Sequence, residues 1–204
     1  MGGDRPMSRI YIGLPQLEGK LPSYAKRYDL LEVRPVDTPL PKPSALSRWR
    51  ERVPPSFAFS VVLPQAVSTF DRSAEFDRAL SQSLGAATAL QAACVVLATP
   101  AAMRPTQANR QRIVELSERL PRGGQVLAWQ PAGIWEPQDV LATAAAGGYV
   151  PVFDAAQEPL APGPVAYTRI RSLGHAGRIG AGRIARMAEQ LANRRIAYVV
   201  VDSP

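Results

Sequence analysis

Eight short runs rich in branched apolar residues recur along the chain, and helical patterns separate most of them. Most runs are continuously apolar rather than strictly alternating, which is typical of strands in a parallel sheet covered on both faces. The predicted strands span 9–13, 29–34, 57–63, 93–99, 125–130, 149–154, 165–171 and 196–202. Eight strands with helices between them predict an α/β fold, a single TIM-like (β/α)8 barrel, with a doubly wound open sheet as the alternative.

The helical segments differ in strength along the chain. The clearest periodicity lies at 72–91 and 106–120, where Thr106 is the expected N-cap. Shorter helices are expected at 21–28, 44–52, 136–146 and 182–194. The segment 155–164 carries prolines and a glycine where the sixth helix of a barrel belongs. We therefore expect one shortened barrel domain over 1–204, with a reduced or missing helix after strand six.

The net charge of +7 and the pI near 10.1 raise the possibility of nucleic-acid binding. The arginines are dispersed and form no basic block, so this interpretation stays a second alternative. No apolar run approaches the ~20 residues that span a bilayer, and the first residues show no signal-peptide pattern. Together with a single cysteine, Cys94, these features predict a cytoplasmic protein without membrane contact.

Metal and triad chemistry find little support in the sequence. Zinc sites usually combine several His or Cys ligands, and this chain has one histidine, His175, and one cysteine, Cys94. A Ser-His-Asp triad would have to use His175, which lies in a glycine-rich segment without an evident partner. We expect neither a metal nor a cofactor, and we expect Cys94 to be a buried, inert thiol.

Side chains alternate along a barrel strand between the interior and the helices, and active sites of this fold lie at the C-terminal ends of the strands. Glu32 and Asp154 are the candidate acid and base, because paired carboxylates in different environments can share those roles. The alternative is a buried ion network in which arginines neutralise both and support the barrel. The residues expected at the interior or upper mouth are Glu32, Arg34, Val62, Ala98, Trp129, Asp154, Arg169, Arg171 and Asp202.

A glycine-rich stretch follows the seventh strand and precedes a helix. Gly177 and Gly180 lie in it, with Arg171 and Arg183 close by in sequence. Free backbone N–H groups at a helix start and arginine side chains both suit an anion, so this stretch is a candidate phosphate site. A plain connecting loop that needs glycine for its turns is the alternative.

The three tryptophans have different expected roles. Trp49 is expected to pack a helix against the barrel. Trp129 and Trp135 could stack a ring-shaped ligand over the mouth, or they could plug the upper barrel and make it a dry core.

An ordered series of segments resembles the YecE-like family, also called domain of unknown function 72. The segments are SRIYIG, LPSYAKRYDLLEV, WRERVPPSFAFSVVLP, VVLATPAAMRPTQANRQRIVELSERLP, VAYTRI and RRIAYVVVD. The resemblance implies a TIM-like barrel and no agreed activity, and this chain looks like a divergent, shortened member.

The chain departs from the family pattern mainly at the mouth. Glu32, Asp154, Tyr167 and Arg169 match, whereas the Lys, Arg and His motif positions after the third strand are lost. On the fifth strand the family's Glu-x-Arg is replaced by a segment that starts at Trp129.

These losses predict a barrel with a degenerate active site that acts without the parent chemistry. We expect it to bind a protein partner or a small anionic ligand at the C-terminal mouth, which would use Arg34, Trp129, Arg169, Arg171 and the glycine-rich stretch. The alternative is a metal-independent acid–base enzyme acting on a phosphorylated or other anionic small molecule. The oligomeric state is left open.

Overall fold

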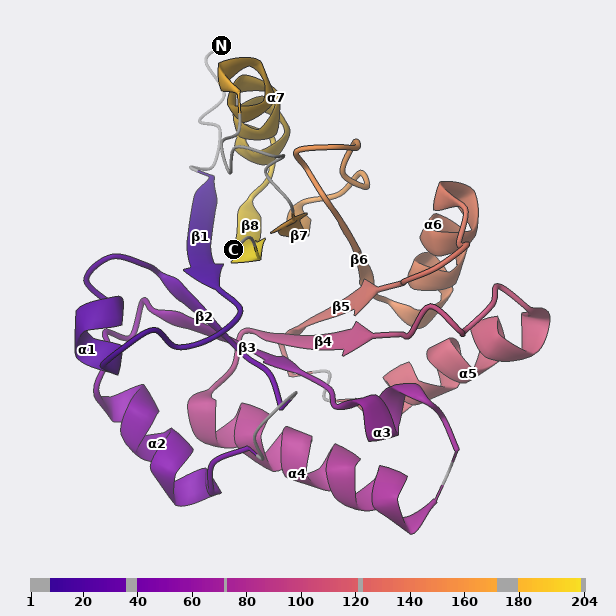
Figure 1. Ribbon diagram of the computed structural model, residues 1–204, viewed down its shortest axis with the longest axis horizontal. Helices are drawn as coiled ribbons and strands as arrows, with labels where there is room; N and C mark the ends of the chain where they lie inside the picture. The colour runs from indigo at the N-terminus through magenta and orange to yellow at the C-terminus, as the bar shows by residue number, and fades with distance from the viewer. Residues whose placement is uncertain (1–7, 36–39, 72, 121–122, 172–179, 203–204) are drawn as a thin grey trace.

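The computed structural model describes residues 8–35, 40–71, 73–120, 123–171 and 180–202. Its eight parallel strands pair in chain order and close into one barrel, with β8 pairing to β1 (Figure 1). The strands are β1 (Arg9–Leu14), β2 (Leu30–Val33), β3 (Ala58–Val62), β4 (Cys94–Ala98), β5 (Val126–Gln130), β6 (Val150–Phe153), β7 (Val165–Arg171) and β8 (Ile196–Asp202). The predicted barrel is therefore confirmed, and the open sheet is excluded.

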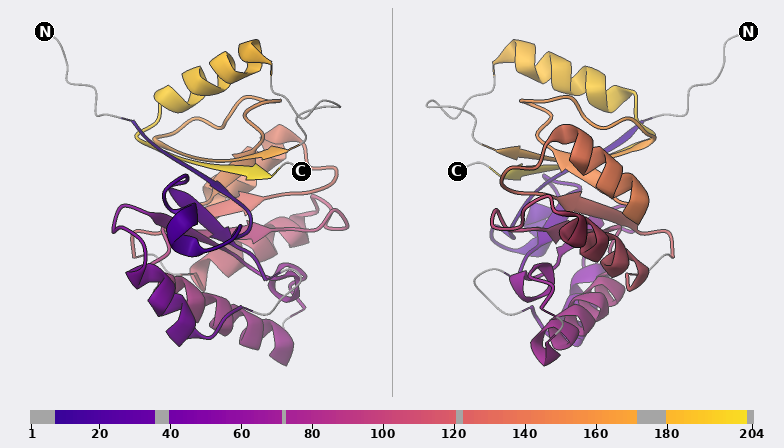
Figure 2. Two further views of the ribbon diagram at one scale, coloured as in Figure 1. Left: turned by 60° about the vertical axis from the view of Figure 1, so that its left-hand side comes forward. Right: turned by 90° about the vertical axis from the view of Figure 1, so that its right-hand side faces the viewer.

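Helices lie outside the strands (Figure 2). They are α1 (Leu21–Tyr24), α2 (Pro43–Glu51), α3 (Gln65–Ser68), α4 (Ala74–Leu90), α5 (Gln107–Glu118), α6 (Pro137–Gly147) and α7 (Ala181–Ala192). Residues 154–164, all of them described, contain no helix, which confirms the expected gap after β6. The first helix is shorter than predicted, and the single turn of α3 was not predicted because four residues show no periodicity.

The helix ends follow from local side-chain chemistry. Ser73 and Thr106 act as N-caps and accept hydrogen bonds at 3.2 Å from the backbone N–H groups of Phe76 and Asn109, respectively. Gly148 ends α6 with a φ of 68°, a left-handed conformation that glycine adopts without steric cost.

The core has two layers, and strand alternation assigns each residue to one of them. The barrel interior is filled by Leu30, Ala58, Val62, Cys94, Val96, Ala128, Val152, Tyr167, Tyr198 and Val200. The second, larger layer lies between the strands and the helices and includes Leu31, Phe59, Leu97 and Ile170. Cys94 is fully buried inside the barrel, and burial raises the pKa of its thiol, as expected for an inert cysteine.

The side of the barrel around β8 and β1 is covered less than the rest. Ile10 and Ile12 on β1 remain 37% and 43% exposed, and α7 buries only Leu191 at its C-terminal end. Figure 2 shows α7 at one edge of the molecule. Within the described ranges, no helix is both long and apolar enough to cross a membrane.

Candidate functional site

The centre of the barrel mouth is a buried ion pair between Glu32 on β2 and Arg169 on β7. The guanidinium donates from Nη2 to Glu32 Oε2 at 2.5 Å, and the two side chains are 0% and 1% exposed. Arg169 also donates from Nε to Gln130 Oε1 at 2.9 Å and from Nη1 to Asp202 Oδ2 at 3.2 Å. Three strands thus hold this arginine in place from three sides.

Glu32 has further partners on either side. The Tyr167 hydroxyl donates to Oε2 at 2.5 Å and, having only one proton, accepts in turn from Ser60 at 2.9 Å. Arg34 Nε lies 3.0 Å from Oε1, but the angle does not suit a hydrogen bond, so the contact is ionic. Among the described residues, Oε1 therefore has no hydrogen-bond partner although it is buried.

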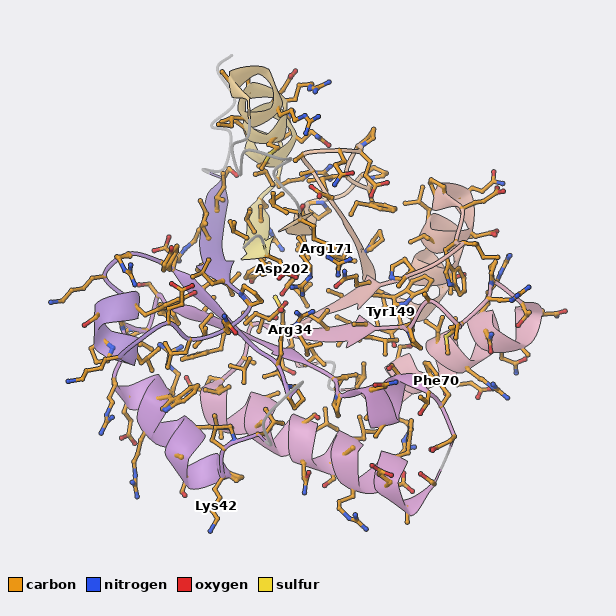
Figure 3. The ribbon with its side chains drawn as sticks, viewed as in Figure 1. Arg34, Lys42, Phe70, Tyr149, Arg171 and Asp202 are labelled. Atoms are coloured by element: carbon orange, nitrogen blue, oxygen red, sulfur yellow. The ribbon has the colours of Figure 1, made fainter. Side chains whose placement is uncertain are left out.

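Asp202 at the end of β8 is the second carboxylate of the cluster. Its Oδ2 lies 3.2 Å from Arg169 Nη1, 3.7 Å from Arg34 Nη1 and 4.0 Å from Arg171 Nε. Figure 3 shows Arg34, Arg171 and Asp202 near the middle of the molecule, around the ends of β2, β7 and β8. Three guanidiniums therefore surround Glu32 and Asp202, and a third carboxylate, Asp154, lies close enough to act on the charge of Arg171.

The charges in the cluster act on one another. Burial lowers the pKa of Arg171, and the neighbouring cations Arg169 and Arg34 lower it further, against a smaller opposing effect of Asp202. Burial also acts to lower the pKa of Arg169, but Glu32, Tyr167 and Asp202 together outweigh it and the pKa is raised. Arg171, half exposed, thus lies where an additional anion would be favourable.

Asp154 lies after β6 and does not share a partner with Glu32 among the hydrogen bonds and ion pairs of the described chain. Its Oδ1 accepts from Ala156 N at 2.9 Å, and its Oδ2 accepts from Gln157 Nε2 at 2.9 Å and from Arg171 N at 3.1 Å. These bonds close the turn after β6 and tie it to β7. The carboxylate linked to Glu32 through shared arginines is Asp202, so the expected pairing of Glu32 with Asp154 is not seen.

Trp129 corrects the expected orientation of β5. Its side chain is fully buried in the layer between strands and helices, where it donates to Thr99 at 3.2 Å and meets Trp135 edge-on with ring centroids 5.0 Å apart. Gln130, the next residue, points to the mouth and contacts Arg169. Trp129 therefore neither stacks a ligand over the mouth nor plugs the barrel, because both predicted roles required its side chain to point inward.

The glycine-rich stretch is described only in part. Gly177 falls outside the described residues. Gly180 is the N-cap of α7, and Arg183 lies exposed in the first turn of that helix. Within the described residues, no hydrogen bond or ion pair joins Arg183 to the mouth cluster, whereas Arg171 belongs to it.

Two pockets open beside the cluster, and Arg34 borders both. The first, of about 350 Å³, lies above the ends of β3 and β4 and includes Gln65, Ser68 and Thr99 in its wall. The second, of about 270 Å³, lies between the segment after β1 and α2 and includes Gln16, Glu32 and Trp49. Arg34 is 23% exposed, so its guanidinium is accessible at the boundary between them.

A metal centre finds no support in the part of the chain that the structure describes. No group of three or more His, Cys, Asp and Glu side chains in it could hold an ion. The two carboxylates of the mouth are each engaged by arginines, which compete with any cation.

Sequence reasoning identified Glu32, Arg34, Arg169 and Asp202 but missed Gln130 as a member of the cluster. The signal was present, because a polar residue ending a buried apolar strand usually faces the mouth of a barrel. On β5, Leu127 and Trp129 face the helices, whereas Ala128 and Gln130 face the barrel interior. The larger apolar pair thus packs under the helices.

Comparisons with known proteins support the fold and the family. A DUF72 protein from Enterococcus faecalis V583 superposes with a TM-score of 0.77 at 16% identity, covering 97% of this chain and 92% of that one. A DUF72 protein from Thermotoga maritima MSB8 gives 0.67 at 14% identity, covering 95% and 92%. An L-ribulose 3-epimerase gives 0.64 at 14% identity, covering 97% and 82%. At these identities the solved structures show the fold alone, and no curated protein matches the chain.

The family model described as protein of unknown function DUF72 matches residues 7–161, well over half of the 204 residues. This match contains β1 to β6 and thus Glu32, Arg34 and Gln130 of the mouth. The chain therefore belongs to the DUF72 family.

Proposed function

We propose that the protein binds a small anionic molecule at the C-terminal mouth of the barrel, with Arg34 pairing to the anion. The observation that carries the proposal is the wall of the pocket above β3 and β4. Among the described residues that line it, Arg34 is the one that carries a charge, and Gln65, Ser68 and Thr99 add polar groups. Pockets at this end of the barrel are the usual ligand sites of the fold.

Arg34 is a better candidate than Arg169 to bind the anion, because its guanidinium is more exposed. Arg169 is buried and already donates to Glu32, Gln130 and Asp202. Arg34 is partly exposed, and its nearest contact with Asp202 is a long 3.7 Å. A guanidinium in this state can turn part of its donor fork to a phosphate or carboxylate oxygen.

Arg171 supports the same ligand from the opposite side of the cluster. Its guanidinium is half exposed, and its contact with Asp202 is only 4.0 Å. Burial, and after it the charges of Arg169 and Arg34, lower the pKa of Arg171, so an added anion would relieve repulsion among the three cations. Because Asp154 also acts on Arg171, the attraction for an anion rests on the accessible guanidiniums of Arg34 and Arg171 rather than on an excess of positive charge.

An acid–base enzyme acting on the same anionic molecule is the second candidate. It is favoured by Glu32 Oε1, a buried carboxylate oxygen without a hydrogen-bond partner in the described residues. Asp202, which shares two arginines with Glu32, would be its partner carboxylate in place of Asp154. Turnover of an anionic substrate that is lost in a Glu32→Gln variant shown to be folded, and retained in Asp154→Asn, would identify this chemistry.

Titration calorimetry with inorganic phosphate tests the anion site. We expect Arg34→Gln to weaken phosphate binding at least about tenfold, the effect of losing one charge-assisted hydrogen bond. Arg171→Gln should weaken binding less, because its guanidinium belongs to the cluster but does not line the pocket.

The matched control is Arg52→Gln, an exposed arginine that caps the C-terminal end of α2, at the opposite end of the barrel. Equal phosphate affinity of the wild type, Arg34→Gln and Arg52→Gln, with folding intact, would refute the proposed site.

A further inference from the structure

We infer that the ligand of this mouth is an anionic sugar, meaning a sugar phosphate or a sugar acid, whose hydroxylated part occupies the second pocket beside Arg34. The inference rests on the anion site proposed above and adds the class of molecule that carries the anion. Its basis is that Arg34 borders two pockets of different chemistry.

The second pocket combines polar groups with an aromatic wall. Gln16 and Glu32 supply an amide and a carboxylate, and Trp49, Leu17 and Leu40 supply apolar surface. Trp49 is half-buried, so part of its indole packs on the core while part remains accessible. A sugar ring fits this combination, because its C–H face packs on apolar surface while its hydroxyls bond to polar side chains.

Glu32 sets the charge of the group that enters this pocket. Its Oε1 is a buried acceptor that lacks a hydrogen bond among the described residues, a situation that a hydroxyl donor would relieve. Arg34 Nε lies against this oxygen at 3.0 Å, so a shift of Arg34 toward an anion in the neighbouring pocket would open the way to it. The two pockets are thereby coupled through one side chain.

Other ligand classes suit the pair of pockets less well. A second anion beside Glu32 would meet the carboxylate, and an ammonium group there would meet the guanidiniums of Arg34 and Arg169 within the same cluster. A neutral hydroxyl avoids both repulsions. The volumes of about 270 and 350 Å³ suit a molecule of monosaccharide size rather than a long chain.

The test is calorimetric titration with inorganic phosphate, ribose 5-phosphate, glucose 6-phosphate and the matching free sugars. We expect at least one sugar phosphate to bind at least about tenfold more tightly than inorganic phosphate, since it adds contacts in the second pocket. Gln16→Ala, which changes an exposed side chain, should weaken that sugar phosphate about fivefold, the effect of one lost hydrogen bond, and leave inorganic phosphate unchanged.

Trp49→Leu should also remove part of the gain, and Gln111→Ala, an exposed amide on α5, is the control that should change nothing. If phosphate binds through Arg34 but no sugar phosphate binds more tightly than phosphate, the sugar inference is overturned and the anion site stands. The same conclusion follows if neither Gln16→Ala nor Trp49→Leu changes the affinity for the sugar phosphate. If neither phosphate nor any sugar phosphate binds, both proposals fail.

Discussion

At the scale of single residues, the central feature of the mouth is the buried ion pair of Glu32 and Arg169. Two opposite charges buried at 0% and 1% exposure are tolerated because Tyr167 also donates a hydrogen bond to Glu32, and Arg169 also donates to Gln130 and Asp202. Such a network supports the barrel and also fixes where Arg34 and Asp202 lie at the mouth. The expected buried ion network therefore exists, although it includes Asp202 instead of Asp154.

Glu32→Gln should destabilise the protein by about 3–5 kcal/mol, because it leaves the guanidinium of Arg169 buried without its main counter-charge. Urea unfolding measures this as a lower midpoint with an unchanged slope. The comparison is Asp77→Asn, which breaks the exposed pair with Arg119 and should cost less than about 1 kcal/mol. Equal losses in the two variants would show that burial does not set the strength of the mouth pair.

At the scale of elements, the sequence predicted the strands well because each is a short, continuously apolar run. All eight strands lie within about a residue or two of their predicted bounds, and the helix missing after β6 was predicted from its prolines. The orientation of Trp129 was predicted wrongly because strand alternation was assigned in the wrong phase on β5, where Ala128 rather than Trp129 faces the interior. Local patterns determine where a strand lies, whereas which face becomes interior depends on strand pairing across the barrel.

The connection from β6 to β7 shows how a missing helix is replaced. Asp154 closes the turn through Ala156 N and reaches across to Arg171 N. Asp154→Ala should therefore speed hydrogen exchange at the Arg171 amide at least about fivefold, through loss of a charge-assisted hydrogen bond. Phosphate affinity should stay within twofold of the wild type, since Asp154 does not line the pocket that Arg34 borders.

The same variant separates the two interpretations of Asp154. If Asp154→Ala leaves hydrogen exchange at the Arg171 amide unchanged but abolishes phosphate binding, Asp154 is not a turn-closing residue. It would then belong to the ligand site. Amides of β3, such as that of Val61, serve as the internal reference for global opening.

At the scale of the whole molecule, closure of the barrel brings aromatic hydroxyls and the thiol into the two core layers. Tyr167, Tyr198 and Cys94 face the interior, and Tyr24 and Tyr149 lie in the outer layer. The sequence predicted the burial of Cys94, whereas contacts such as that of Ser60 with Tyr167 join residues more than 100 positions apart and could not be predicted from a local pattern. The resulting property belongs to the fold as a whole and has a measurable consequence for pH stability.

Burial raises the pKa of Tyr24 to about 12 from an ordinary value of 10, and it raises the pKa of Tyr149, Tyr198, Tyr167 and Cys94 as well. In the unfolded chain these groups release protons at their ordinary pKa values, whereas the folded protein keeps them bound. The stability that these protonated groups contribute is therefore fully present below about pH 8. The free energy of unfolding falls as the pH rises through 9 to 12, by about 1.4 kcal/mol per pH unit for each group that is ionised in the unfolded chain.

Urea unfolding at pH 7, 9, 10 and 11 measures this fall through the free energy of unfolding. Tyr149→Phe removes one such group and should make the decline above pH 10 shallower, although it also loses the hydrogen bond to Ile113 O and so lowers stability at pH 7. A stability that stays constant from pH 7 to 11 would contradict the burial of these hydroxyls, and with it the two-layered core that the closed barrel requires.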